Sequence, residues 1–430
     1  MASKTLREQY EEFRASLGLR EGMRLTRPLD EPAMGRLVQL LLSHGVQIKA
    51  SDIHIEPTAT GARVRYRVDG TLYEMLQLQR ELRDPLTRSI KVRANMSNDG
   101  FGRSKPQDSR IDFETDGHNL DLRISSFPTM LGDVLAIRIL DRSRPLLKLE
   151  ELGFPPGVLR TFEGLFRRPN GFLLVTGPTG SGKTTTLYAA LNKLCSPRIK
   201  IITLEDPVEY QMEGIDQGQI NPSIGLTFAS GLRAVLRQDT NVILVGEMRD
   251  KETADIAIRA ALTGHLVLST MHARHSWGAV TRLLDMQIEP HLILASVTGI
   301  VAQRLVRLVC RQCRQPDTLA AQSFERIWAQ ETGNAPLIGE PRLLKGAGCT
   351  TCNKTGYEGR LGVFEVLVLT DDLRQLILER ATGQVYRSAL TASRLKTMLV
   401  DGLEKAAQGL TTLEEVLRVM DAPDAEGAEE

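Results

Sequence analysis

The chain has 430 residues, of which 42% are hydrophobic and 25% charged, and its 54 Lys and Arg nearly balance its 53 Asp and Glu. This composition is typical of a globular protein of two or three domains, and the near-zero net charge gives no overall indication of a nucleic-acid or membrane-surface binder. The sequence has no apolar stretch of about 18 residues and no apolar signal-peptide core at its start, so we expect a cytoplasmic protein.

The first part of the chain predicts a small α+β domain. Residues 1–33 are polar and charge-rich, and we expect them to form an arm. The apolar spacing over 34–43 predicts an amphipathic helix, and short alternating runs within 52–73 predict a hairpin of half-buried strands. Further strands are expected within 120–140. Strands and helices ahead of any nucleotide motif indicate a separate domain over 34–145.

From residue 146 the chain alternates apolar strands with helices, which predicts a parallel sheet covered on both faces. We expect this second domain to extend over 146–420 and to be followed by an acidic tail at 421–430. The predicted fold class is therefore α/β, with a smaller α+β domain in front.

A complete phosphate-binding motif, G-x-x-x-x-G-K-[ST], lies between an apolar strand at 172–175 and a helix. Its glycines let backbone N–H groups turn toward the phosphates, Lys183 adds a positive charge, and the Thr184 hydroxyl can ligate Mg²⁺. A glycine-rich turn that binds nothing would not need both flanks. The chain is therefore predicted to bind a nucleoside triphosphate through Gly177, Pro178, Thr179, Gly180, Ser181, Gly182, Lys183, Thr184 and Thr185.

Two acidic residues end apolar strands of the same predicted sheet. Glu247 follows a buried run at 241–245, an arrangement that delivers a carboxylate to the Mg²⁺ side of a bound triphosphate. Glu205 follows a run at 201–204, and we expect it to act on the attacking water. The structural alternatives are an acidic residue that merely ends a strand and, before Pro207, simple turn chemistry.

Histidines bracket a third apolar strand, with His265 before it and His272 after it. Polar residues at the end of a central strand beside the nucleotide can sense the γ-phosphate, and we assign that role to both histidines. A purely structural role is the alternative, and we keep it for His275 and His291.

Two C-x-x-C pairs form a set typical of a closed tetrahedral Zn²⁺ site within a subdomain at about 305–365. A redox motif would need only one pair, and Cys195 stands alone, which favours ordinary packing. Four arginines near the first pair are expected on a helix with a solvated or subunit-facing side. The predicted zinc ligands are Cys310, Cys313, Cys349 and Cys352, and the arginines are Arg304, Arg307, Arg311 and Arg314.

These motifs, in this order, resemble those of the secretion ATPases of the type II secretion and type IV pilus family, the GspE/PulE/PilB group. The resemblance covers about residues 35 to 415. Besides the phosphate loop and the cysteines, it depends on Ala50 to Pro57, Val64 to Gly70, Pro106 to Ile111, an aspartate box at Leu204 to Tyr210, a Walker B motif at Gly246 to Asp250, and a histidine box at Gly264 to His272.

The resemblance implies a homo-hexamer of RecA-like motor domains, each with a PAS-like N-terminal domain that closes on the nucleotide. In the family, arginines of that domain reach the phosphates, and the matching positions here are Arg110, Arg123 and Arg138. An arginine at a transferring phosphate stabilises transition-state charge. The structural alternative for each is a strand arginine that faces solvent.

Three departures from the family pattern accompany the resemblance. The chain reads as a short form without the extra N-terminal domain of larger members, similar to competence-pseudopilus ATPases. Ser109 stands where glycine is common, and Ala273, Arg274 and His275 stand where threonine, asparagine and aspartate are common. These changes leave hydrolysis intact and leave the docking partner open.

The resemblance therefore implies a Mg²⁺-dependent ATPase at the cytoplasmic face of the inner membrane, held there by an inner-membrane platform protein. It would power a type IV pilus, a competence pseudopilus or a type II secretion pseudopilus. One alternative is a nucleic-acid translocase with a RecA-like motor and a zinc module, but near-neutral charge and missing base-stacking aromatics count against nucleic-acid contact. The other is a small-molecule kinase, which predicts a monomer with an acceptor pocket.

Overall fold

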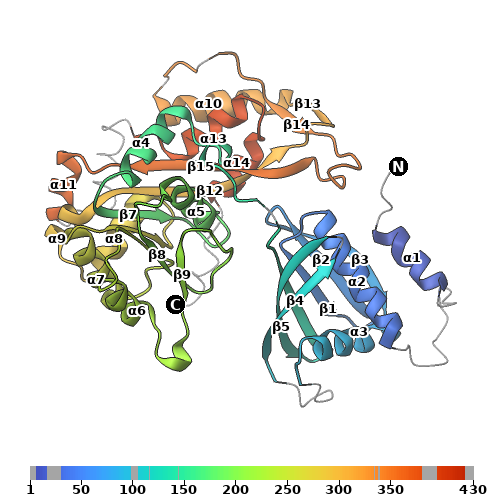
Figure 1. The fold of residues 1–430 in the computed structure, drawn as a ribbon. Coiled ribbons are helices and arrows are strands. Elements are labelled where there is room, and N and C mark those ends of the chain that lie inside the picture. Colours follow the sequence, from blue (N-terminus) through green and yellow to red (C-terminus); the bar gives the residue numbers. More distant parts are fainter. Residues whose placement is uncertain are drawn as a thin grey trace. The chain divides into compact units, whose positions relative to one another are not determined.

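A computed structural model describes residues 6–16, 31–97, 105–115, 117–143, 145–333, 335–337, 339–379 and 395–421. The chain folds as two compact units, Met1–Pro145 and Leu146–Glu430, coloured blue to teal and green to red in Figure 1. Of the predicted acidic tail only Asp421, at the end of the last helix, lies within the described residues. Throughout these ranges, no helix has the length and apolarity that crossing a bilayer requires.

The first unit is built on a six-stranded antiparallel sheet in the order β3-β2-β1-β6-β5-β4. Alternate residues of each strand face the core: Ile53 and Ile55 of β1 are buried, whereas Asp52 and His54 point to the other face. The elements are α1 (Leu6–Ser16), α2 (Glu31–Gln47), β1 (Asp52–Pro57), β2 (Gly61–Val68), β3 (Thr71–Gln79), α3 (Arg80–Arg93), β4 (Gln107–Thr115), β5 (His118–Thr129) and β6 (Gly132–Asp141).

Helix α1 differs from the arm predicted for residues 1–33. Leu6, Tyr10 and Phe13 lie on one side of α1 and are buried in the same core as α2 and the sheet. Their spacing is that of an amphipathic helix, but charged neighbours dominate the segment and conceal the short apolar stripe. Residues 6–16 therefore belong to the first unit.

The second unit contains a seven-stranded sheet in the order β15-β12-β7-β11-β10-β8-β9, parallel except for β15, which pairs antiparallel with β12. Separate apolar cores lie on its two faces, with α4 and α5 on one and α6 to α9 on the other. Figure 1 shows α13 and α14 beside β15. This doubly covered sheet explains why its strands are continuous apolar runs.

The bounds of the second unit follow the chain. They are η1 (Leu149–Glu151), α4 (Pro156–Phe166), β7 (Gly171–Thr176), α5 (Lys183–Leu194), β8 (Ile201–Glu205), β9 (Asp216–Gln219), η2 (Pro222–Ile224), α6 (Phe228–Val235), β10 (Val242–Val245), α7 (Lys251–Leu262), β11 (Leu266–Met271), α8 (Ser276–Asp285), α9 (Pro290–Ser296), β12 (Val297–Val309), β13 (Arg314–Pro316), η3 (Thr318–Ala320), α10 (Ala321–Thr332), β14 (Leu344–Gly346), β15 (Tyr357–Leu367), α11 (Asp371–Leu378), α13 (Met398–Ala407) and α14 (Leu413–Asp421).

Strand β12 corrects a prediction, because Arg304 and Arg307 were expected on a helix. Arg304 is buried and donates to the backbone carbonyl of Val419. Arg307 pairs with Glu415 at 2.7 Å and lies over the ring of Tyr357. Since β12 is buried on both faces, its apolar residues do not alternate with polar ones, and the strand could not be told from a helix by periodicity.

Candidate functional site

The phosphate loop connects β7 to α5 at the edge of the parallel sheet where the strands end. Gly177, Gly180 and Gly182 have φ angles of 153°, 78° and 86°, a region that residues with a Cβ rarely adopt. Gly182 directly precedes α5, so the loop leads into a helix N-terminus whose first N–H groups lack helical partners. The loop therefore has the backbone shape and the free donors that a phosphate group needs.

Lys183 is folded back onto the loop. Its Nζ donates to the carbonyls of Gly177 at 2.7 Å and Pro178 at 3.0 Å, and the residue is 8% exposed. A triphosphate offers charged acceptors, which form stronger hydrogen bonds with an ammonium group than carbonyls do. Thr184 and Thr185 are exposed at the start of α5, so the Thr184 hydroxyl is open to solvent and can act as a Mg²⁺ ligand.

Glu247 and His272 lie together at the same sheet edge. Glu247 follows β10 and His272 follows β11, and because these strands are parallel neighbours their ends meet. His272 Nε2 lies 3.0 Å from Glu247 Oε1, and Arg249 Nε donates to Glu247 Oε2 at 2.6 Å. The hydrogen bond from His272 lowers the pKa of Glu247 to about 2 against the opposing effect of burial, and Arg249 adds to this. The carboxylate is therefore ionised at neutral pH, as a Mg²⁺ ligand must be.

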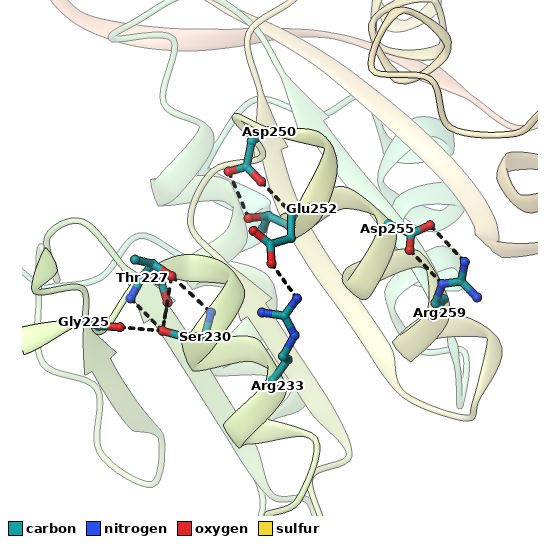
Figure 2. A network of polar contacts seen from close by, with 9 residues as sticks. Gly225, Thr227, Ser230, Arg233, Asp250, Glu252, Asp255 and Arg259 are labelled. Atoms are coloured by element: carbon teal, nitrogen blue, oxygen red, sulfur yellow. Dashed lines mark hydrogen bonds and ion pairs between the residues drawn. The ribbon is translucent and has the colours of Figure 1, made fainter.

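Hydrogen bonds and an ion pair fix the segment that follows Glu247, as Figure 2 shows. Asp250 caps α7, accepting from the Thr253 N–H at 2.8 Å and from the Thr253 hydroxyl at 3.1 Å. Glu252, in the first turn of α7, pairs with Arg233 of α6 at 2.5 Å. These contacts attach the Walker B-like segment to two helices and limit how far Glu247 can move.

Glu205 is buried and fully hydrogen-bonded. It is 3% exposed; Tyr188 donates to Oε2, and Thr203 and Gln217 donate to Oε1 at 2.6 and 3.3 Å. Tyr188 lies on α5, so this network joins the phosphate-loop helix to the aspartate-box segment. Burial, with the charge of Glu205, raises the pKa of Tyr188, so its hydroxyl remains a donor. Tyr188 and Gln217 were missed in the sequence because neither residue type belongs to a nucleotide motif.

The two bracketing histidines lie at opposite edges of the sheet, which corrects the assignment of His265 to the nucleotide side. In the parallel pair β11 and β7, Leu266 is opposite Gly171 and Met271 opposite Thr176. His265 therefore precedes the strand end that is about 17 Å from the phosphate loop, at about 3.3 Å per residue. Its Nδ1 lies 3.1 Å from the carbonyl of Ala260. A contact between His265 and a nucleotide in the loop of its own chain is excluded by this position.

His275 has a structural role in the same region. Its Nδ1 accepts from the Gly278 N–H at 3.0 Å and caps α8. An aspartate side chain can form the same cap, so this departure from the family pattern preserves the local structure.

The three arginines of the first unit lie in one cross-strand row. Arg110 of β4 is opposite Arg123 of β5, which is opposite Arg138 of β6. The row continues through Asp52 of β1 to Arg67 of β2. Asp52 accepts from Arg138 at 3.1 Å and lies 3.6 Å from Arg67, so it separates two guanidinium groups. Arg67 and Asp52 were not predicted, although their alternation with buried neighbours would have placed them on this face.

Arg110 is held by a buried carboxylate. Its guanidinium donates to both oxygens of Asp121, which is 1% exposed, and Arg142 lies 3.3 Å from the same carboxylate. Burial by itself raises the pKa of Asp121, but the hydrogen bonds and charge of Arg110, with those of Arg142, lower it overall. Arg110 is therefore not simply an arginine that faces solvent.

The four predicted zinc ligands come together. Cys310 and Cys313 follow β12, Cys349 and Cys352 precede β15, and all four sulfur atoms lie within 4.8 Å of one another. Nearest Sγ–Sγ distances are 3.7 to 3.8 Å, and a tetrahedron with Zn–S bonds of about 2.3 Å has edges of about 3.8 Å. Backbone N–H groups, such as Gly356 N at 3.3 Å from Cys352 Sγ, donate to the sulfurs. The donor set fits a structural Zn²⁺ ion.

A model of the family described as Type II/IV secretion system protein matches residues 29–418. The chain is 44% identical over 392 residues to Type II secretion system protein E of Pectobacterium carotovorum, covering 91% of this chain and 76% of that protein. It is also 44% identical over 390 residues to Type II secretion system ATPase E of Vibrio cholerae, with the same coverage, and 45% identical over 384 residues to HxcR of Pseudomonas aeruginosa, covering 89% and 76%.

Two solved structures share the fold. The pilus retraction motor PilT with bound ADP is 26% identical, with a TM-score of 0.59, covering 90% of this chain and 97% of PilT. The Legionella pneumophila ATPase DotB is 22% identical, with a TM-score of 0.65 and coverage of 93% and 96%, and supports the fold alone. The predicted α/β fold class with a RecA-like motor is confirmed.

Proposed function

The chain belongs to the Type II/IV secretion system protein family, and on that premise we propose that it hydrolyses ATP to drive the pseudopilus of a type II secretion machine. The observation that carries this proposal is a complete phosphate loop at the same sheet edge as the Glu247–His272 pair. The choice of machine follows the names of the relatives, which are type II secretion proteins. A type IV pilus and a competence pseudopilus are the other machines that such a motor could drive.

Nucleotide binding would use the loop and the start of α5. The backbone N–H groups of the loop would hold the β- and γ-phosphates, and Lys183 Nζ would exchange its two carbonyl acceptors for phosphate oxygens. Mg²⁺, when bound, would neutralise charge on those phosphates, and Thr184 and Glu247 would hold it. The low pKa of Glu247 supports this role, because it keeps the carboxylate charged over the whole physiological range.

The two glutamates would have different roles in hydrolysis. With a pKa of about 2, Glu247 is a weak proton acceptor and suits metal binding and water orientation. Glu205 would act on the attacking water, and for that its carboxylate must exchange one of its present donors for the water. His272 would hold Glu247 in place and respond to the γ-phosphate.

Arginines of the first unit would complete the site in a homo-hexamer. Arg110, Arg123 and Arg138 lie in one row, and a row of guanidinium groups can stabilise charge on a transferring phosphoryl group. The ring would work at the cytoplasmic face of the inner membrane, attached through a platform protein, with a structural Zn²⁺ on the four cysteines.

Lys183→Ala tests the proposal. ATP binding should weaken and hydrolysis should fall to background, because the loop loses its positive side chain. Lys200→Ala, at an exposed lysine outside the loop, is the matched control and should keep wild-type turnover. Normal hydrolysis by Lys183→Ala would remove the assignment. Stimulation of turnover by DNA would instead favour the nucleic-acid translocase, which none of the relatives described above supports.

A further inference from the structure

Gln303 of β12 is a buried residue that contacts the phosphate loop at two points. It is 2% exposed; its Nε2 donates to the carbonyl of Ser181 at 2.8 Å, and its Oε1 accepts from the Thr186 hydroxyl at 2.7 Å. Ser181 lies in the loop and Thr186 in the first turn of α5, on either side of Lys183. Both polar groups of the amide are used, so neither a leucine nor a glutamate could make the same two contacts.

The loop also packs directly on Gln303. Ala302 of β12 is opposite Thr176 of β7, so Gln303 lies level with the first residue of the loop. A Cβ added to Gly177 would lie 2.3 Å from the Gln303 carbonyl oxygen, and one added to Gly182 would lie 2.8 Å from Nε2. Real Cβ atoms do not approach other atoms so closely. Two glycines of the loop are therefore required by the contact with Gln303 as well as by their positive φ.

We propose that Gln303 is a positioning residue that keeps the phosphate loop in its binding shape; this inference rests on the proposed ATP binding. When Lys183 turns to the phosphates, the loop loses the two hydrogen bonds that Lys183 makes to the carbonyls of Gly177 and Pro178. The contacts of Gln303 use neither Lys183 nor any group that must face the phosphates. They hold Ser181 and the start of α5 both with and without nucleotide, which lowers the conformational cost of binding.

Gln303→Glu tests the donor contact in the full-length protein, with fluorescent mant-ADP as the probe. At about pH 8.5 the carboxylate faces the Ser181 carbonyl without a proton to donate, and mant-ADP affinity should fall about tenfold or more. A buried carboxyl group has a raised pKa, so lowering the pH to about 6 should protonate it, restore a donor and recover affinity. Gln315→Glu, at an exposed glutamine of β13, is the matched control and should show neither effect.

Thr186→Val and Gln303→Leu test the acceptor contact. Each should weaken mant-ADP binding, and the two changes combined should cost less than the product of the single effects, because they remove one shared hydrogen bond. If Gln303→Leu does not fold, Thr186→Val and the pH dependence of Gln303→Glu still decide the question. Wild-type affinity of both at all pH values would overturn the positioning role. Failure of the wild-type protein to bind mant-ADP would instead overturn the proposed function.

Discussion

Replacing Tyr188 with phenylalanine should slow ATP hydrolysis much more than it weakens ATP binding. The change removes one hydroxyl, which donates to Glu205 where that carboxylate is 3% exposed. A hydrogen bond to a buried charged group contributes about 1.5–3 kcal/mol. If Tyr188 orients Glu205 toward the attacking water, the loss of that orientation should lower kcat about 10- to 100-fold. KM for ATP should change little, because the hydroxyl contacts no part of the phosphate loop.

The assay is steady-state ATP hydrolysis by purified protein, with thermal unfolding measured in parallel. Tyr66→Phe is the matched control: it removes a buried hydroxyl that donates to the Leu41 carbonyl at 3.0 Å in the first unit. It should cost about 1 kcal/mol of stability and leave kcat unchanged. In a Glu205→Gln background, Tyr188→Phe should have little further effect on kcat. Wild-type kcat for Tyr188→Phe, or an undiminished effect without the Glu205 carboxylate, would refute the reasoning.

Glu247→Gln should keep ATP bound while turnover stops, measured on the same sample; since the pKa of Glu247 is lowered to about 2, its charge stabilises the fold above its unfolded value of 4.5 and is lost only as pH falls toward 2, so the pH profile of turnover should show no step from this group between about pH 5 and 9. Elemental analysis should find one zinc per chain; Cys349→Ser should lose it and, with it, a share of the roughly 10–16 kcal/mol of apparent binding energy typical of such sites, whereas Cys195→Ser should keep the metal. Asp121→Asn should remove acid sensitivity from the first unit: the lowered pKa of Asp121 means that its ion pair with Arg110 stabilises the fold above about pH 3.8 and is lost as pH falls below it, so the wild type should lose about 2 kcal/mol more than the variant on acidification, and equal acid titrations by circular dichroism would contradict this.

The sequence predicted which strand ends carry chemistry, because parallel strands end at one edge of their sheet. The loop after β7, Glu247 after β10 and His272 after β11 follow that rule, and the structure brings Glu247 and His272 within 3.0 Å. The same rule, applied to strand direction, would have separated His265 from His272. His265 precedes the strand whose end carries His272, and a histidine at each end of one parallel strand cannot serve the same edge.

The residues that support the site were not predictable from motifs or periodicity. Tyr188, Gln217 and Gln303 are common residue types without a repeating pattern around them. Their contacts depend on strand order, since Gln303 meets Thr186 across 117 positions of the chain and Gln217 meets Glu205 across 12. The sequence does not give the order β15-β12-β7-β11-β10-β8-β9, and without it no argument places β12 beside the phosphate loop.

That strand order also joins two sites that the sequence presents as separate motifs. Strand β12 contacts the phosphate loop through Gln303, bonds α14 through Arg304 and Arg307, and ends at Cys310 of the cysteine cluster. A buried β-strand is stiff along its length, because both of its edges are hydrogen-bonded to neighbours. A shift of the loop on nucleotide binding is therefore resisted or followed by the whole strand. By linkage, whatever fixes α14 or the cysteine cluster changes the free energy of nucleotide binding by the same amount that nucleotide changes theirs.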